Sequence, residues 1–368
     1  MSFTDQLAAP VGGYRHSAQT TAARHEGVID WPLFDWLRLV LASVVVIGHA
    51  GAGVVGDYGN LAVQVFFALS GWLIGGILMR ADVGDIPRFY FNRATRIWIP
   101  FLVCVLTLYA VAILKGGYAP RYLEFLLYDL TFTHNLFIPK TPDVIAAMPM
   151  QGTGAHFWSI AVEEQFYLAA PFLILMLPAG RSVLLWAMIA ALMVWQQGWY
   201  GSIAMGVLAA ALAHQFGDWH LRRWAWLGLG VLMIATFAGF SANPSFYALL
   251  APLFSVAVVL LCARPGRRGP VGKFFGAISF PVYLWHWVGL FGANMVWKMG
   301  GFDPSLRPAV GYALSLMIGA VAWMAIDRPV MQLRNQWYSP ALGQTLMAAA
   351  FALLLAGLTT AMVLQPLR

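Results

Sequence analysis

Long apolar runs separated by short polar links make up most of this chain. A helix that crosses the hydrocarbon core of a bilayer, about 30 Å thick, needs about 20 predominantly apolar residues. Eleven runs have about this length, at 33–56, 61–80, 95–115, 156–178, 182–199, 200–215, 224–241, 246–263, 274–297, 308–326 and 342–363. A further apolar stretch at 121–138 is interrupted by Glu124, Asp129 and His134. The pattern predicts an all-α, polytopic bundle of transmembrane helices.

The composition makes a bilayer the necessary solvent. Apolar residues make up 60% of the 368 and charged residues 10%, whereas soluble domains have roughly 45–50% and about 25%. The net charge of +7 comes mainly from basic residues in the short links, so we interpret it as a topology signal and not as a surface for nucleic acid. Cys104 and Cys262 lie far apart in separate apolar runs and have no spacing typical of a disulfide framework or a zinc site.

Basic residues in the links predict how the spans are oriented. Because Arg and Lys gather in cytoplasmic loops, an even number of spans separates each basic link from the next. This rule places 116–155 on the outer side, with 121–138 re-entrant or lying on the membrane surface. It gives eleven spans with the N-terminus inside. Residues 1–31 lack the apolar core of a signal peptide and are predicted to be a cytoplasmic tail, 32–336 the transmembrane domain, and 337–368 an additional C-terminal helix.

Ionisable side chains within apolar runs are the first functional candidates, because they are costly at membrane depth. The first run holds Asp35, Arg38 and His49, which fall within roughly a 60° arc of one helical face. His49 has the chemistry of a general base, or it is a histidine satisfied by a bond between helices. Asp35 and Arg38 are functional or form an interfacial ion pair. His286, near the middle of the membrane, either makes a structural hydrogen bond or lines a pocket.

The next candidates are small or basic residues. Ser70, beside Gly71 in the second run, suits either a substrate contact or close helix packing. Arg93 and Arg96 lie one helical turn apart at the start of the third run. Two guanidiniums on one face form a good site for phosphate, although cytoplasmic helix starts attract arginine for topological reasons alone.

Two adjacent carboxylates occur near the start of the 156–178 run. Glu163 and Glu164 project about 100° apart on a helix, so one faces the bundle when the other faces the headgroups. Trp158 and Tyr167 flank them. The inward carboxylate either orients a histidine or an acceptor hydroxyl, or it is an interfacial acid without a partner.

Taken together and in this order, these stretches resemble the acyltransferase 3 family of bacterial membrane O-acyltransferases. The resemblance extends from residue 35 to about 334 and implies a ten-helix core, to which 342–363 adds one span. The matching stretches are Arg38 with His49, FFALSGWLI at 66–74, FNRATRIWIP at 91–100, WSIAVEEQFYLAAP at 158–171, SFPVYLWH at 279–286 and IDRPV at 326–330.

The resemblance implies roles for the candidates, carried over by position. His49, Arg38 and Glu163 are expected to be catalytic, and Arg93 and Arg96 to bind acyl-CoA. The remaining candidates are expected to line the substrate pocket: Asp35, Ser70, Trp158, Tyr167 and His286. Asp327 departs from the family pattern, which more often has Glu at that position before x-Pro, and this weakens its own assignment.

The function implied by the resemblance is transfer of a short acyl group, most often acetyl, across a bacterial inner membrane. The donor substrate is cytoplasmic acyl-CoA, such as acetyl-CoA, with no permanently bound cofactor. The acceptor is a hydroxyl of an extracytoplasmic glycan or lipid-linked saccharide. His49 acts as a general base or forms an acyl-histidine. The main alternative is a transporter or flippase of polysaccharide precursors, which also needs buried charges but should show internal repeats. A catalytically inactive scaffold is the third interpretation.

Overall fold

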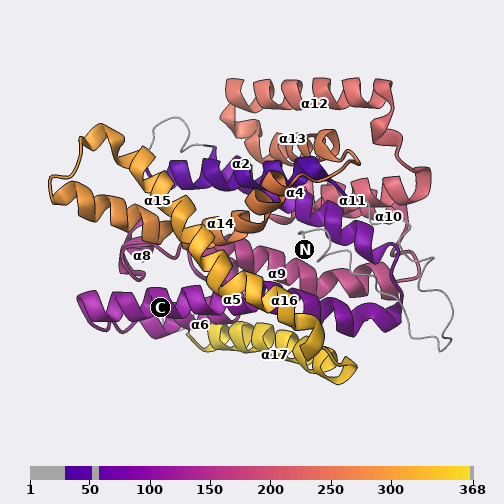
Figure 1. The fold of residues 1–368 in the computed structure, drawn as a ribbon. Helices are drawn as coiled ribbons and strands as arrows, with labels where there is room; N and C mark the ends of the chain where they lie inside the picture. Colours follow the sequence, from indigo (N-terminus) through magenta and orange to yellow (C-terminus); the bar gives the residue numbers. More distant parts are fainter. Residues whose placement is uncertain (1–29, 52–57, 365–368) are drawn as a thin grey trace. The chain divides into compact units, whose positions relative to one another are not determined.

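The computed structural model describes residues 30–51 and 58–364. Within these ranges every regular element is a helix and no strand occurs, as Figure 1 shows. The all-α class predicted from the apolar runs is therefore confirmed. Residues 1–29 of the predicted tail, and residues 52–57 at the end of the first apolar run, lie outside the described ranges.

All eleven predicted runs contain a helix, but the helices differ in length. Among the described residues, nine helical stretches are long and apolar enough to cross a membrane. The other two, α10 (Val183–Trp195) and α11 (Tyr200–Phe216), have 13 and 17 residues. A turn between them, with Gln197 at a φ of 54° and Gly198 after it, ends α10 before it reaches the usual length.

The first of two compact units comprises the described residues up to Asp85 and Ala170–Ala325. Its helix pair α4 and α11 packs closely: a Cβ atom on Gly71 or Gly206 would collide with the backbone of the other helix, so Gly71 serves packing. Ser202 Oγ donates to Gln64 Oε1 across the pair at 2.5 Å. The helices of this unit beyond α10 and α11 are α2 (Pro32–His49), α4 (Gly59–Leu78), α12 (Arg223–Ala242), α13 (Tyr247–Cys262), α14 (Pro270–Lys298) and α15 (Arg307–Ala322).

A buried ion pair joins α2 to the start of α14 in this unit. Arg268 Nε donates to Asp35 Oδ2 at 2.6 Å, and Arg268 Nη2 donates to Asp35 Oδ1. Both side chains are 1% exposed. Gly276 leaves room for the carboxylate, because a Cβ there would overlap it. The two helices run in the same direction, since His49, at the other end of α2, contacts His286 further along α14.

The second unit comprises Ile86–Ala169 and the described residues from Ile326 onward. Its long helix α5 is covered by α17, where Gly343 approaches the backbone of Pro87 too closely for a side chain. The connection from α5 to α9 forms short helices of nine, four and six residues, too short to cross a membrane. Its helices are α5 (Ile86–Gly116), α6 (Tyr122–Leu130), α7 (His134–Phe137), α8 (Pro142–Ala147), α9 (Phe157–Pro171), α16 (Arg328–Trp337) and α17 (Pro340–Leu364).

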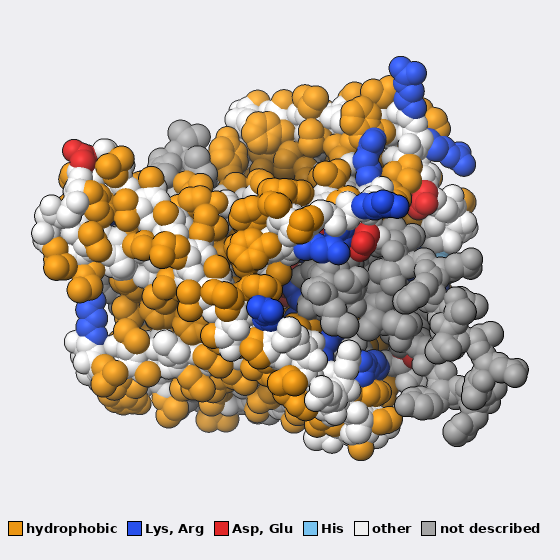
Figure 2. Space-filling view, in the orientation of Figure 1, with side chains coloured by type: hydrophobic (Ala, Val, Ile, Leu, Met, Phe, Trp, Pro, Cys, Tyr) orange, Lys and Arg blue, Asp and Glu red, His pale blue; other side chains and the backbone are white. Residues whose placement is uncertain are grey.

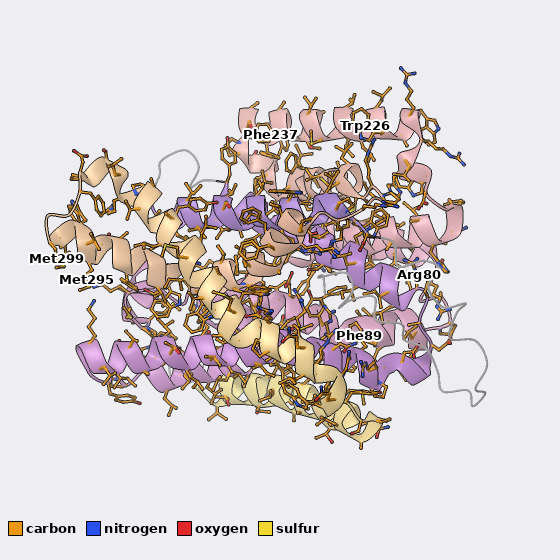
Figure 3. All side chains as sticks on the ribbon, in the orientation of Figure 1. Arg80, Phe89, Trp226, Phe237, Met295 and Met299 are labelled. Atoms are coloured by element: carbon orange, nitrogen blue, oxygen red, sulfur yellow. The ribbon has the colours of Figure 1, made fainter. Side chains whose placement is uncertain are left out.

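Apolar side chains cover most of the face drawn in Figure 2. Figure 3 marks examples on the first unit, including Trp226 of α12, which is 41% exposed, and Met295 near the end of α14, which is 66% exposed. Such side chains would be unfavourable in water but suit lipid. The protein is a multi-pass membrane protein.

The Asp35–Arg268 pair predicts a specific pattern of stability losses. Arg268→Met should lower the free energy of unfolding by about 3–5 kcal/mol, because it leaves a buried carboxylate without its main partner. Combining it with Asp35→Leu should restore most of the loss, since both charges are then removed. Thermal unfolding in detergent measures both variants. Losses that simply add in the double variant would show that the two charges are not coupled.

Candidate functional site

The sequence candidates of the first unit centre on two histidines that are far apart in the chain. His49 Nδ1 lies 2.9 Å from His286 Nε2, and the rings stack with centroids 5.0 Å apart. His286 Nδ1 lies 2.7 Å from the carbonyl oxygen of Tyr283. A carbonyl only accepts, so His286 carries its proton on Nδ1 and accepts at Nε2. His49 must then donate from Nδ1, which leaves the lone pair of His49 on Nε2.

Burial separates the roles of these two rings. His286 is 2% exposed, and its backbone carbonyl accepts a hydrogen bond from Ser315 Oγ on α15 at 3.0 Å. His49 is the last residue of α2 and is exposed. The buried ring is therefore hydrogen-bonded at both nitrogens, whereas the ring of His49 is exposed. The sequence predicted either a structural bond or a pocket role for His286, and the structure shows the hydrogen bond.

Asp35 and Arg38 lie on the buried side of α2, 1% and 3% exposed. Their closest charged atoms are 3.8 Å apart, so the expected i, i+3 pair exists but is not the main contact of Asp35. That contact is Arg268, which sequence reasoning assigned to a topological role. Ser70 lies half-buried on α4 in the same unit.

The candidates of the second unit gather around Arg93 on α5. Its guanidinium carbon lies 5.5 Å from the centre of the Tyr167 ring and 5.8 Å from that of Phe89, and it hydrogen-bonds to Tyr167. Both Glu163 and Glu164 act on it electrostatically. Arg93 is 6% exposed, so the structure brings a buried cation, an aromatic ring and two carboxylates together.

The adjacent carboxylates differ as the helix geometry predicted. Glu164 is 6% exposed and accepts a hydrogen bond from Trp98 Nε1 at 2.8 Å, whereas Glu163 is half-buried. The family motif assigns the functional acid to Glu163, and the structure adds Glu164 as the carboxylate that faces the inside of its unit.

Further arginines lie near this group, and sequence reasoning did not select two of them, Arg334 and Arg88. Arg334 on α16 is 2% exposed and lies within electrostatic range of Arg93 and Arg88. Arg88 covers the ring of Tyr338 at 4.2 Å. Arg96 acts electrostatically on Asp327. The search for ionisable residues within apolar runs did not select Arg334, because it lies in a polar, amphipathic helix that follows the last core span.

Trp158, at the start of α9, makes a cation–π contact with the ammonium group of Lys140. Lys140 Nζ is 3.8 Å from the centre of its ring, and Trp158 is 7% exposed. Burial lowers the pKa of Lys140 to about 8, because desolvation disfavours the ammonium form.

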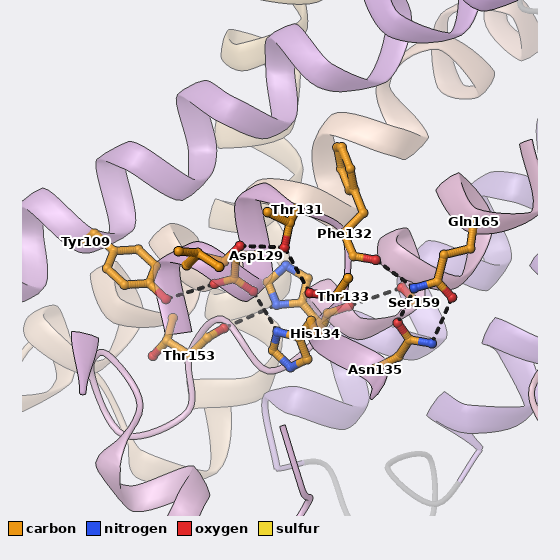
Figure 4. A network of polar contacts seen from close by, with 12 residues as sticks. Tyr109, Asp129, Thr131, Phe132, Thr133, His134, Asn135, Thr153, Ser159 and Gln165 are labelled. Atoms are coloured by element: carbon orange, nitrogen blue, oxygen red, sulfur yellow. Dashed lines mark hydrogen bonds and ion pairs between the residues drawn. The ribbon is translucent and has the colours of Figure 1, made fainter. Parts of the chain in front are cut away.

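The connection between α5 and α9 holds a network of polar side chains, drawn in Figure 4. His134 Nδ1 lies 2.6 Å from Asp129 Oδ1, and Asn135 and Gln165 exchange amide hydrogen bonds at 3.2 and 2.8 Å. Asp129 and His134 were noted in the sequence only because they interrupt an apolar stretch. Among the described residues, no three His, Cys, Asp or Glu side chains cluster as metal ligands would.

Comparison with known proteins identifies the family. The model of the acyltransferase 3 family, an acyltransferase domain, matches residues 31–328. A putative membrane-bound transacylase, BcsY of Komagataeibacter xylinus, is 24% identical over 349 residues, which cover 82% of this chain and 83% of that protein. The O-acetyltransferase OatA of Staphylococcus aureus is 30% identical over 151 residues, 39% of this chain and 24% of OatA. No solved structure matches.

The family match covers most of the chain and confirms the resemblance seen in its motifs. The match also favours an enzyme over the transporter and the inactive scaffold, because the family and the relatives are described as acyl-transferring enzymes. The chain belongs to the acyltransferase 3 family and is a membrane-bound O-acyltransferase.

Proposed function

We propose that this enzyme moves a short acyl group, acetyl in the first instance, from cytoplasmic acyl-CoA to a hydroxyl of an extracytoplasmic glycan, either an exopolysaccharide or a lipopolysaccharide sugar. The bacterial inner membrane holds it with the N-terminus in the cytoplasm. The observation that carries the proposal is the hydrogen-bond chain from the Tyr283 carbonyl through His286 to His49.

The chain of hydrogen bonds gives His49 the property that acyl transfer requires. Its Nε2 carries the lone pair, so this atom either removes a proton from the incoming hydroxyl or attacks the thioester to form an acyl-histidine. In both routes the ring becomes cationic, and His286 stabilises it by accepting from Nδ1. When His49 acts as the base, the C–S bond breaks and the thiolate of CoA takes up the proton that His49 removed from the hydroxyl. When His49 attacks the thioester, CoA leaves as the thiolate, and the proton released when the hydroxyl later takes the acyl group from the ring balances that charge.

Arginines of the second unit supply the chemistry for the nucleotide part of the donor. Arg93 and Arg96 present fixed positive charge, and guanidinium groups bind phosphate oxygens in a forked geometry. Burying Arg93 beside Arg334 is costly when no anion is bound. The ring of Tyr167 and the carboxylates Glu163 and Glu164 hold Arg93 in place.

His49→Ala should abolish acyl transfer while CoA binding is retained. Loss of the reacting nitrogen should lower the rate of CoA release from acetyl-CoA by at least about 100-fold. The measurement is CoA release by purified protein in lipid nanodiscs, with His214→Gln as a control at an exposed histidine. A variant that still turns over would remove His49 from the mechanism.

His286 should act through the position of His49 and not by contact with substrate. His286→Gln keeps an oxygen that accepts from His49 Nδ1, whereas His286→Phe keeps only the ring. We expect kcat to fall about 10- to 100-fold more in the Phe variant, with KM for acetyl-CoA unchanged in both. Equal losses, or a change confined to KM, would contradict this role.

The Arg93→Ala/Arg96→Ala variant should raise KM for acetyl-CoA by about 10-fold or more, because each charge-assisted bond to phosphate contributes about 1.5–3 kcal/mol. KM for S-acetylpantetheine, which lacks the nucleotide, should not change. Arg223→Ala removes an exposed arginine of the first unit and is the matched control. Equal effects on both donors would show that the arginines do not bind the nucleotide part.

A further inference from the structure

A second buried imidazole, outside the proposed chemistry, lies in the connection between α5 and α9. Asp129 and His134 are 2% and 4% exposed. His134 Nδ1 is 2.6 Å from Asp129 Oδ1, and Tyr109 OH donates to Asp129 Oδ2 at 2.9 Å. Both oxygens of the carboxylate are thereby used, as burial of a charged group requires.

The partners of Asp129 determine the tautomer of His134. A carboxylate only accepts, so the proton of the ring lies on Nδ1 and the lone pair on Nε2. Among the described residues Nε2 has no hydrogen-bond partner, and Figure 4 shows this nitrogen on the side of the ring turned away from Asp129. When Nε2 takes a proton, the adjacent carboxylate stabilises the imidazolium. This is the arrangement in which an acid orients a catalytic histidine.

Polar side chains that hydrogen-bond to one another surround the pair. Thr131 and Thr133 exchange a hydrogen bond at 2.9 Å, and the Gln165 amide donates to the Phe132 carbonyl at 2.6 Å. On the other side α17 packs so closely that a Cβ on Gly357 would lie 2.5 Å from Thr131 Oγ1. A loop that only connected two helices would not need a buried acid, an imidazole and this backing helix.

The connection between α5 and α9 is expected on the side of the membrane where an extracytoplasmic acceptor would bind. Its helices are too short to cross a membrane, and the distribution of basic links puts residues 116–155 on the outer side. An extracytoplasmic glycan would be met on that side.

We propose that Asp129 and His134 form the base that activates the acceptor, a polyhydroxylated molecule of the saccharide class. This inference rests on the proposed function. His134 Nε2 removes the proton of the acceptor O–H as its oxygen bonds to the acyl carbon. The bond from that carbon to the departing group breaks, and the departing group takes up the proton from His134. Asp129 is the positioning residue.

Two acceptors separate this role from a structural one. Methyl glucoside offers hydroxyls that need a base, whereas hydroxylamine attacks acyl groups at neutral pH without prior deprotonation. In His134→Gln we expect acetyl transfer to methyl glucoside to fall about 100-fold, and transfer to hydroxylamine to change less than about threefold. The rate measured without protein is subtracted from each rate. His214→Gln, at an exposed histidine, should alter neither, and His49→Ala should lose both.

Any other result would contradict either this inference or the proposed function. Equal losses with both acceptors in His134→Gln would make the pair structural, and full activity with methyl glucoside would make it irrelevant. Transfer to hydroxylamine but not to methyl glucoside by the unaltered protein would also overturn the inference. If His134→Gln does not purify in folded form, Asp129→Asn, which keeps an oxygen opposite His134 Nδ1, gives the same comparison. Failure of the unaltered protein with both acceptors would instead contradict the proposed function.

Discussion

A polar group inside a membrane protein must find its partner within the protein, because hydrocarbon offers none. In a chain that is 60% apolar, this constraint limits the positions at which polar and reactive side chains can lie. Asp35 is held by Arg268, His49 by His286, and Glu164 by Trp98. The same bonds that make burial tolerable also orient the side chains, so the energetic requirement and the preorganisation of a reactive group are met together.

The apolar runs predicted the helices well because hydropathy over about 20 residues is a local property. All eleven runs contain helices, and the stretch interrupted by Glu124, Asp129 and His134 forms short helices instead of a span. The predicted runs 182–199 and 200–215 each contain one helix, but α10 ends at Trp195, before a turn with Gln197 at positive φ. Local turn chemistry overrides hydropathy at such a point.

The partners of the candidate residues could not be predicted. Helical periodicity places Asp35 and His49 on one face of α2, but says nothing about which of the other helices covers that face. Their partners lie 233 and 237 positions away. Arg268 in particular follows the pattern of a topological arginine, and only its contact with a buried carboxylate shows that it holds α2 and α14 together. Roles assigned from motifs, such as that of Glu163, remain predictions until kinetics test them.

Two imidazoles, one in each unit, have a tautomer fixed by their hydrogen-bond partners. In the first unit, a neutral histidine accepts a hydrogen bond from the ring of His49. In the second unit, a carboxylate accepts a hydrogen bond from the ring of His134. An enzyme that takes its acyl group from one side of a membrane and delivers it to a hydroxyl on the other has use for both kinds of histidine.

The most direct test of acyl transfer across the membrane uses sealed, inverted vesicles that contain the protein and hold methyl glucoside in their lumen. Labelled acetyl-CoA is added outside, where the cytoplasmic face is exposed. Transfer across the bilayer predicts labelled acetyl glucoside inside the vesicles and free CoA outside, in amounts that match. CoA release with no label on the glucoside in the lumen would contradict transfer to an acceptor on the far side of the membrane.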